Sequence, residues 1–247
     1  MLWQRPPHPP FDLSTLASNS VHVWRANLVL PPNLLNRISA CLSSDEWARA
    51  KRFRFDRDRD RFIASRATLR HILSRYIDCA AEAIPFDYGA YGKPSLAIQT
   101  TRLEFNLSHS GDIALYAIGQ QPLGIDIEYI KPRSHLENLA RHCLSTSEYA
   151  AWDQQPEATK ITTFLKFWTC KEAYLKALGR GLTQAMTEIE IEFCPHPVLC
   201  MQPHSQGFNP YTLRELTPGE GYVAAIAVAG TDWQLTGWEF DASSMRV

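Results

Sequence analysis

The order of strand-like and helix-like segments recurs along this chain, and that recurrence limits the possible folds more than any single motif does. In the first half, the spacing of apolar residues predicts a strand, two helices and two more strands, over Val21–Leu30, Ser44–Phe55, Arg59–Cys79, Leu103–Leu107 and Ile113–Ile118. A strand then again precedes helices and strands, over Leu123–Tyr129, His135–Cys143, Ser145–Asp153, Ala158–Leu178, Thr187–Phe193, Tyr222–Ala229 and Trp233–Phe240. The sequence therefore predicts helices and strands in both halves.

This pattern predicts an α+β fold made of two similar halves with a cleft between them. We expect an irregular lead over residues 1–20, a first α+β half over residues 21–122 and a second over residues 123–247. The second half begins at the strand that starts with Leu123. Because ligands commonly bind where two units meet, the cleft is the expected site.

The composition and the chain ends exclude several classes of protein. The formal net charge is -1 and 45% of the residues are hydrophobic, which is typical of a globular protein and not of a bulk nucleic-acid binder. The proline-rich start has no apolar run of a signal peptide, and no stretch approaches the ~20 apolar residues of a membrane helix. The six cysteines are scattered without a C-x-x-C pair, so we expect a cytoplasmic protein with reduced thiols and no membrane contact.

The charge is unevenly distributed despite the neutral total. Residues 49–75 contain ten Lys or Arg and three Asp, so this basic segment carries seven excess positive charges and the rest of the chain eight excess negative ones. Such a run is usually a solvated face, but its size in a neutral protein favours a phosphate-rich partner.

Two carboxylates lie on the same face of the predicted strand over Leu123–Tyr129. Side chains alternate across a strand, so Asp126 and Glu128 point to one side, roughly 7 Å apart by strand rise. A wet edge strand would explain this pattern. A Mg²⁺ site would explain it too, because Mg²⁺ takes one or two carboxylates together with phosphate oxygens.

Two further clusters carry chemistry and also have ordinary structural explanations. Glu172 and Lys176 are four residues apart on one helix, either as a surface ion pair or as a third metal carboxylate beside a phosphate-binding lysine. We expect Ser108, His109 and Ser110 in a turn, which either bonds to its own backbone or donates hydrogen bonds to an anion.

Taken together and in this order, the motifs resemble those of the Sfp-type 4′-phosphopantetheinyl transferases. The matching motifs are Tyr91-Gly92-Lys93-Pro94, Asn106-Leu107-Ser108-His109-Ser110, Gly124-Ile125-Asp126-Ile127-Glu128 and Trp168-Thr169-Cys170-Lys171-Glu172-Ala173-Tyr174-Leu175-Lys176. Flanking pieces at residues 51–53, 144–149 and 179–182 also fit, and the resemblance spans about residues 21–240. Thr169-Cys170 departs from the family's commoner serine-containing version of the helix.

The resemblance implies the family's two-half α+β fold and its reaction. Such an enzyme moves 4′-phosphopantetheine from coenzyme A to a serine of an apo acyl, polyketide or peptidyl carrier protein and releases adenosine 3′,5′-bisphosphate. The resemblance also assigns site residues by class. The catalytic set is Glu172, Lys176, Asp126 and Glu128; the Mg²⁺ ligands are Asp126, Glu128 and Glu172; the coenzyme contacts are Arg49, Arg66, Lys93, Pro94, Ser108, His109 and Lys176.

Some points stay open at this stage. The serine's proton could pass to Glu172, to Glu148 or to a metal-bound water, and we favour Glu172. The rival functions are a non-catalytic module that binds nucleotide phosphates and a metal-dependent phosphohydrolase. Because one chain can supply the whole cleft, we expect a monomer.

Overall fold

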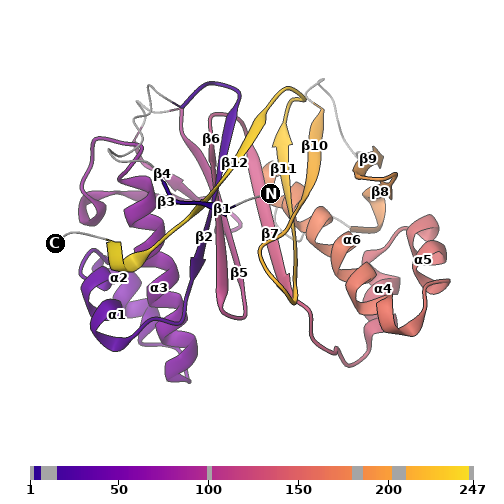
Figure 1. The fold of residues 1–247 in the computed structure, drawn as a ribbon, viewed down its shortest axis with the longest axis horizontal. Coiled ribbons are helices and arrows are strands. Elements are labelled where there is room, and N and C mark those ends of the chain that lie inside the picture. Colours follow the sequence, from indigo (N-terminus) through magenta and orange to yellow (C-terminus); the bar gives the residue numbers. More distant parts are fainter. Residues whose placement is uncertain (1–2, 7–15, 99–101, 180–185, 202–209, 245–247) are drawn as a thin grey trace.

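Two β-sheets lie next to each other in the middle of the molecule, and the helices cover their outer sides (Figure 1). The computed structural model describes residues 3–6, 16–98, 102–179, 186–201 and 210–244. The layers run helices, sheet, sheet, helices. The expected α+β class is confirmed.

The first sheet has five strands in the order β1-β12-β2-β6-β5. These strands are β1 (Trp3–Gln4), β12 (Gln234–Glu239), β2 (Ser20–Asn27), β6 (Ile113–Gly119) and β5 (Glu104–Ser110). Its outer side is covered by α1 (Pro32–Ser39), α2 (Ser44–Ala50) and α3 (Asp56–Leu73). Trp24 and Tyr116 are among the fully buried side chains between this sheet and its helices.

The second sheet has three antiparallel strands in the order β10-β11-β7. They are β10 (Tyr211–Leu216), β11 (Tyr222–Ala229) and β7 (Leu123–Tyr129), and the helices on this side are α4 (Leu136–Cys143), α5 (Thr146–Asp153) and α6 (Glu157–Leu178). Two short hairpins flank the sheets: β3 (Phe86–Tyr88) with β4 (Pro94–Leu96), and β8 (Glu190–Phe193) with β9 (Pro197–Met201). Short 3-10 helices cover Ala81–Ala83, Met186–Glu188 and Ala242–Ser244.

A third apolar core joins the two sheets. Val23 and Leu115 of the first sheet and Ile125, Ile127 and Ile226 of the second are buried together in it. This explains the apolar side of β7: Ile125 and Ile127 alternate with Asp126 and Glu128, so burying the isoleucines leaves the carboxylates on the opposite side.

Several elements differ from the sequence-based predictions. The helix expected from Ser44 ends at Ala50, and α3 begins only at Asp56 because Phe55 is extended. The helix predicted to reach Cys79 ends at Leu73. Helix α1 was not predicted, although Pro at the start of a helix is favourable.

Two further differences affect the site and the boundary between the halves. Ser108, His109 and Ser110 belong to strand β5 and not to a turn, since the β5–β6 connection is only Gly111 and Asp112. Strand β12, near the end of the chain, pairs in parallel with β2 and so completes the first sheet. The turn predicted at Gly89–Pro94 does connect β3 to β4.

Candidate active site

Polar side chains at alternate positions of β5 bind to β7 and join the two sheets. Asn106 Oδ1 accepts the backbone N–H of Ile125 at 2.9 Å. The Ser108 hydroxyl donates to Asp126 Oδ1 at 2.8 Å, and the Ser110 hydroxyl donates to Glu128 Oε2 at 3.0 Å. The period-two spacing of these three residues puts them on one face of the strand, where each holds its counterpart on β7.

The carboxylate of Asp126 is held on one oxygen only. Besides the Ser108 hydroxyl, Oδ1 accepts a hydrogen bond from the Lys176 ammonium at 2.6 Å. Oδ2 is buried and has no hydrogen-bond partner within the described chain. A buried carboxylate oxygen without a donor is unfavourable unless something else neutralises it, so the geometry suits a cation at this atom.

Glu128 shows the same arrangement. Its Oε2 accepts from the Ser110 hydroxyl and from the Arg133 guanidinium, the latter at 3.0 Å. The Ser110 oxygen in turn accepts the backbone N–H of Tyr129 at 3.0 Å, which fixes the hydroxyl. Among the described residues, no bond is made by the other carboxylate oxygen of Glu128.

Glu172 brings a third carboxylate to this cluster from α6. Burial raises its pKa, the negative charges of Asp126 and Glu128 raise it further, and Lys176 opposes them, which leaves it at about 7. Within the described residues it forms no ion pair with Lys176, which pairs with Asp126 instead. The four-residue spacing therefore delivers both side chains to β7 instead of making a surface ion pair.

The carboxylates do not form a finished metal site. No group of three His, Cys, Asp or Glu side chains that could hold an ion occurs in the part of the chain the structure describes. The ammonium of Lys176 and the guanidinium of Arg133 lie on Asp126 and Glu128. Even so, carboxylate oxygens are the donors that Mg²⁺ prefers, and the unpaired Asp126 Oδ2 fits such an ion.

Lys93 connects the β3–β4 hairpin to the end of α6. Its ammonium donates to the carbonyl oxygens of Lys176 at 2.8 Å and Leu123 at 3.2 Å, and burial lowers its pKa. Lys93 thus contacts the backbone of the residue whose ammonium binds Asp126. It anchors that part of α6 to the hairpin.

A cavity of about 390 Å³ opens beside this cluster, between the two halves. Its lining comes from the hairpin, from β5 and from α6: Tyr91, Gly92, Lys93, Pro94, Asn106, Leu107, Glu172, Leu175, Lys176 and Gly179. Residues 180–182, which complete a flanking motif, lie outside the described residues. His109 is exposed nearby, and partial desolvation together with the Lys176 and Arg61 charges lowers its pKa.

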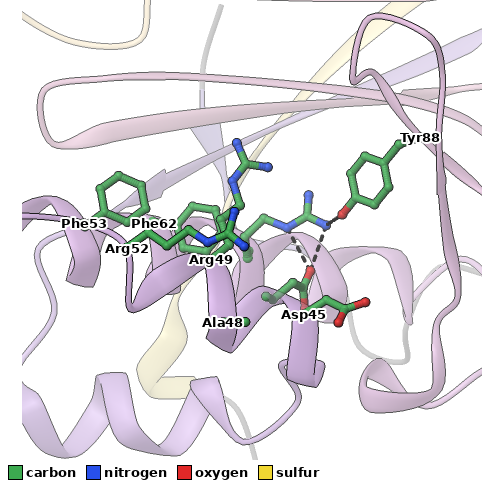
Figure 2. A pocket seen from close by; sticks show the side chains of 9 residues that line it. Asp45, Ala48, Arg49, Arg52, Phe53, Phe62 and Tyr88 are labelled. Atoms are coloured by element: carbon green, nitrogen blue, oxygen red, sulfur yellow. Dashed lines mark hydrogen bonds and ion pairs between the residues drawn. The ribbon is translucent and has the colours of Figure 1, made fainter.

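Arg49 and Arg66 lie in a second cavity, in the first half of the chain. This cavity of about 670 Å³ is lined by Asp45, Glu46, Ala48, Arg49, Arg52, Phe53, Phe62, Arg66 and Tyr88 (Figure 2). Tyr88 ends strand β3, and the same hairpin carries Tyr91–Pro94 to the first cavity. The hairpin therefore borders both cavities.

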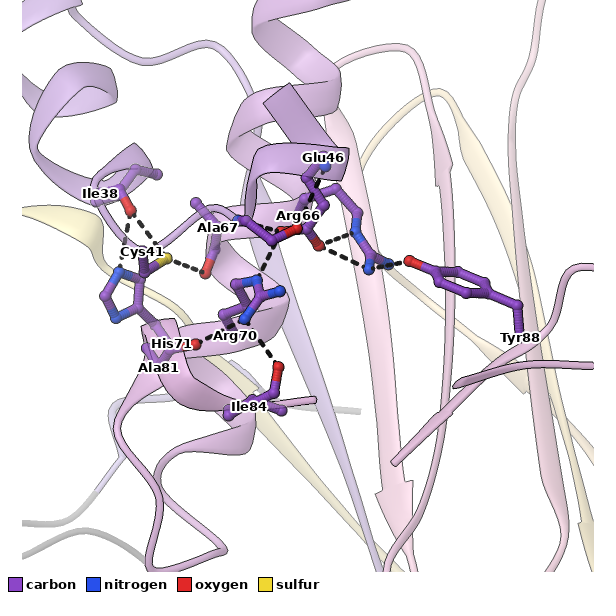
Figure 3. Close-up of polar contacts among 11 residues, drawn as sticks. Ile38, Cys41, Glu46, Arg66, Ala67, Arg70, His71, Ala81, Ile84 and Tyr88 are labelled. Carbon is purple, nitrogen blue, oxygen red and sulfur yellow. Dashed lines mark hydrogen bonds and ion pairs between the residues drawn. The ribbon is translucent and has the colours of Figure 1, made fainter. Parts of the chain in front are cut away.

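The two arginines differ in their surroundings. Arg49 is exposed at the cavity, whereas Arg66 is buried and binds Glu46 Oε1 through its Nε and terminal nitrogens, both at 2.8 Å (Figure 3). Arg70 binds the other Glu46 oxygen at 2.7 Å, and Tyr88 accepts from Arg66 at 2.9 Å. Arg66 and Arg70 of the basic segment are therefore buried inside the fold and do not belong to a solvated face.

Glu148 has a structural role that the sequence did not reveal. It is 3% exposed and caps α5, where its carboxylate accepts the backbone N–H groups of Ser145 and Ile191. The buried Lys171 ammonium pairs with Glu148 and also donates to the carbonyls of Cys143 and Met186. Both Glu148 oxygens thus accept hydrogen bonds inside the fold, and the side chain is almost fully buried.

Comparisons with known proteins identify the family of this chain. The family model described as the 4′-phosphopantetheinyl transferase superfamily matches residues 122–227, and the model of the 4′-phosphopantetheinyl transferase N-terminal region matches residues 32–121. The chain is 42% identical to the 4′-phosphopantetheinyl transferase HetI of Nostoc sp. over 92% of this chain and 94% of that protein. It is 27% identical to the 4′-phosphopantetheinyl transferase Sfp of Bacillus subtilis over 80% of this chain and 86% of that one.

Among solved structures, the holo-[acyl-carrier-protein] synthase of Thermotoga maritima is similar over 44% of this chain and 62% of that one, at 25% identity and a TM-score of 0.38. In the described residues, no helix is both long and apolar enough to cross a membrane. The family models together span most of the chain and meet next to the start of β7. The chain is a 4′-phosphopantetheinyl transferase and belongs to the superfamily of that name.

Proposed function

We propose that this transferase moves 4′-phosphopantetheine from coenzyme A to a serine of apo acyl, polyketide or peptidyl carrier proteins, and that Mg²⁺ bound by Asp126, Glu128 and Glu172 assists it. The observation that carries the proposal is that the charges of Asp126 and Glu128 on β7 act on Glu172 of α6, beside the Lys176 ammonium that pairs with Asp126. The electrostatics are compatible with a metal: the pKa of Glu172 is raised by burial first and then by the negative charges of Asp126 and Glu128. A divalent cation relieves that repulsion.

The proposed reaction forms one phosphorus–oxygen bond and breaks another. The carrier serine oxygen forms a bond to the phosphorus next to pantetheine, and the bond from that phosphorus to the bridging oxygen breaks. The leaving group is adenosine 3′,5′-bisphosphate. The serine proton passes to a base, for which we propose Glu172, acting directly or through a water molecule, because its carboxylate forms no ion pair among the described residues whereas Glu148 is paired with buried Lys171. When bound, Mg²⁺ supplies positive charge at the phosphate oxygens.

Lys176 contributes a second positive charge at the same place. Its ammonium donates to Asp126, to the Ser108 hydroxyl at 3.1 Å and to the Ile125 carbonyl at 3.2 Å. These contacts hold the charge in place before the substrate arrives, so little reorganisation is needed during reaction. Preorganised charge of this kind is typically the largest catalytic contribution.

We also propose how the coenzyme lies. The cavity of about 390 Å³ lined by Lys93, Pro94 and Lys176 takes the part of the coenzyme near the pyrophosphate. Ser108 accepts a hydrogen bond from Lys176 and His109 lies within reach of the same charge, so we place both residues near the phosphates. The larger cavity at Arg49 and Arg66 takes the 3′-phosphate. One hairpin borders both cavities, which supports a single ligand extending along it. We place the enzyme in the cytoplasm as a monomer, since both halves of one chain line the site.

The test of the proposed function is the variant Asp126→Asn, which keeps the size of the side chain but removes its charge. We expect transfer to fall by about 100-fold or more, in keeping with the ~3–4 kcal/mol that one preorganised contact often contributes. The measurement is the intact mass of an apo carrier protein after incubation with coenzyme A and Mg²⁺. Asp153→Asn on the exposed end of α5 is the control and should retain full transfer.

The same assay distinguishes the rival functions. Mass gain on the carrier supports the transferase, hydrolysis of coenzyme A without a carrier supports a phosphohydrolase, and binding without turnover supports a binding module. Full transfer by a folded Asp126→Asn variant contradicts the proposed metal site.

A further inference from the structure

Asp126 and Glu128 are held in the same way by different residues. Each has one oxygen that accepts from a β5 serine and from a cation: Ser108 and Lys176 for Asp126, Ser110 and Arg133 for Glu128. In each case the second oxygen makes no bond within the described chain. Both carboxylates are thereby oriented with one oxygen to spare.

The two cationic side chains come from different parts of the fold. Lys176 comes from α6, whereas Arg133 lies in the loop after β7, only five residues beyond Glu128. The loop turns back before α4, where His135 has a left-handed backbone with φ of 62°. The loop also bonds to the β10–β11 connection, through the Ile130 N–H and the Gly221 carbonyl at 2.8 Å.

Arg133 is positioned for Glu128 and for no other partner among the described residues. Its side chain is 23% exposed and that of Glu128 is 21% exposed, so their pair at 3.0 Å is shielded from much of the solvent. Its Nε is buried without a hydrogen-bond partner in the described chain. Burying the Nε donor without a partner is unfavourable. Arg133 nevertheless keeps this position, in which it contacts one oxygen of Glu128, and this points to a function in orienting that carboxylate.

We infer that Arg133 is a positioning residue that fixes Glu128 so that one of its carboxylate oxygens remains available to the divalent cation. This inference rests on the proposed function, which makes Glu128 a metal ligand. A partner that orients a metal-binding carboxylate typically changes metal affinity by about 10–100-fold when removed. The opposite expectation follows if Arg133 merely competes with the metal, because its removal would then strengthen metal binding.

The test is a titration of Mn²⁺ into the enzyme saturated with coenzyme A, with free Mn²⁺ measured by electron paramagnetic resonance. We expect Arg133→Met to raise the Kd by about tenfold or more and Arg133→Lys to recover part of the loss, because it restores the charge without the fork of donors. Arg141→Met on α4 is the control, since Arg141 pairs with exposed Glu137 and lies over the Tyr149 ring, and neither partner is a proposed metal ligand. Circular dichroism checks that each variant is folded.

Unchanged or tighter Mn²⁺ binding by folded Arg133→Met overturns the inference. The variant Asp126→Asn, titrated alongside, separates this failure from failure of the proposed function. If Asp126→Asn loses Mn²⁺ and Arg133→Met does not, only the role of Arg133 is wrong. If neither loses Mn²⁺, the metal site itself is wrong.

Discussion

At the scale of single residues, Arg49 and Arg66 share a cavity but differ in what else they do. Arg66 and Arg70 neutralise the buried carboxylate of Glu46, which also completes the capping box of α2 with Ser43. The Arg66 and Arg70 charges and the capping hydrogen bond outweigh desolvation and lower the pKa of Glu46. Arg49 has no acidic partner among the described residues and stacks over Phe62 at 5.3 Å.

The two arginine variants should therefore separate binding from stability. We expect Arg49→Ala to weaken coenzyme A binding by about tenfold or more, the equivalent of ~1.5–3 kcal/mol for a hydrogen bond to a charged group, while dephospho-coenzyme A binding and stability stay unchanged. Arg66→Ala should lower the free energy of unfolding by about 1–3 kcal/mol, because Glu46 Oε1 loses its hydrogen bonds while Arg70 still neutralises the carboxylate. Calorimetry and urea unfolding give the two quantities.

A wild-type enzyme that binds coenzyme A and dephospho-coenzyme A equally well contradicts the assignment of this cavity to the 3′-phosphate. Arg54→Ala is the control, since Arg54 is exposed and lies outside the cavity lining.

At the scale of elements, the contact between α6 and β7 decides where the site chemistry lies. Gly124 lies where the helix crosses the strand, and an added Cβ would come within 2.1 Å of the Ala173 oxygen and 2.4 Å of the Ala177 nitrogen. These are backbone atoms, so they cannot rotate aside. Only glycine lets α6 approach this closely, and the approach brings Lys176 to Asp126.

Gly124→Ala should therefore push α6 away from β7. We expect a loss of stability of at least ~1–3 kcal/mol, the usual cost of overpacking, and a loss of transfer activity that exceeds the fraction unfolded, because Lys176 no longer reaches Asp126. Urea unfolding and the carrier mass assay measure the two effects. Gly89→Ala is a matched control, because its nearest neighbour is an ordinary 3.7 Å away. Wild-type stability in Gly124→Ala would show that the helix can shift without cost.

The elements also show which features the sequence could predict. Strands β7 and β11 were predicted to the residue, because each has a sustained apolar pattern bounded by turn signals. The Ser108 and Ser110 positions were misjudged, since polar residues that face a neighbouring strand look like a turn when that strand is unknown. Helix α1 was missed because Pro31-Pro32 was taken as the end of a strand and not as the start of a helix.

The contacts of Arg133 and of the Glu148–Lys171 pair could not be predicted from the sequence, because each of these side chains binds a residue that only folding brings near.

At the scale of the whole molecule, distant segments of the chain hold the first half together. His22 of β2 binds the Tyr76 hydroxyl through Nδ1 at 2.8 Å and packs edge-on against Trp238 of β12, with ring centres 5.8 Å apart. This contact joins the start of the chain, the segment after α3 and the last strand. Because β12 follows the strands of the second sheet in sequence and pairs with β2, folding of the first sheet depends on nearly the full length of the chain.

This contact predicts how stability depends on pH. Burial lowers the pKa of His22 from 6.5 to about 4. The folded state therefore binds this proton less readily than the unfolded state does. Its contribution is fully present above pH 6.5 and is lost progressively as the pH falls toward 4. We expect His22 to account for about 3 kcal/mol of lost unfolding free energy between pH 7 and pH 4.

The variant His22→Gln isolates this contribution, because glutamine keeps a polar side chain and does not titrate. Urea unfolding at pH 7, 5.5 and 4.5 should show a smaller decrease in stability than in the wild-type protein, although the variant starts from a lower value at pH 7. His196→Gln is the control, since His196 is exposed and should leave the decrease unchanged. An equal decrease in His22→Gln would assign the acid sensitivity to other groups. A smaller one would show that protonation of His22 contributes to the loss of stability in acid.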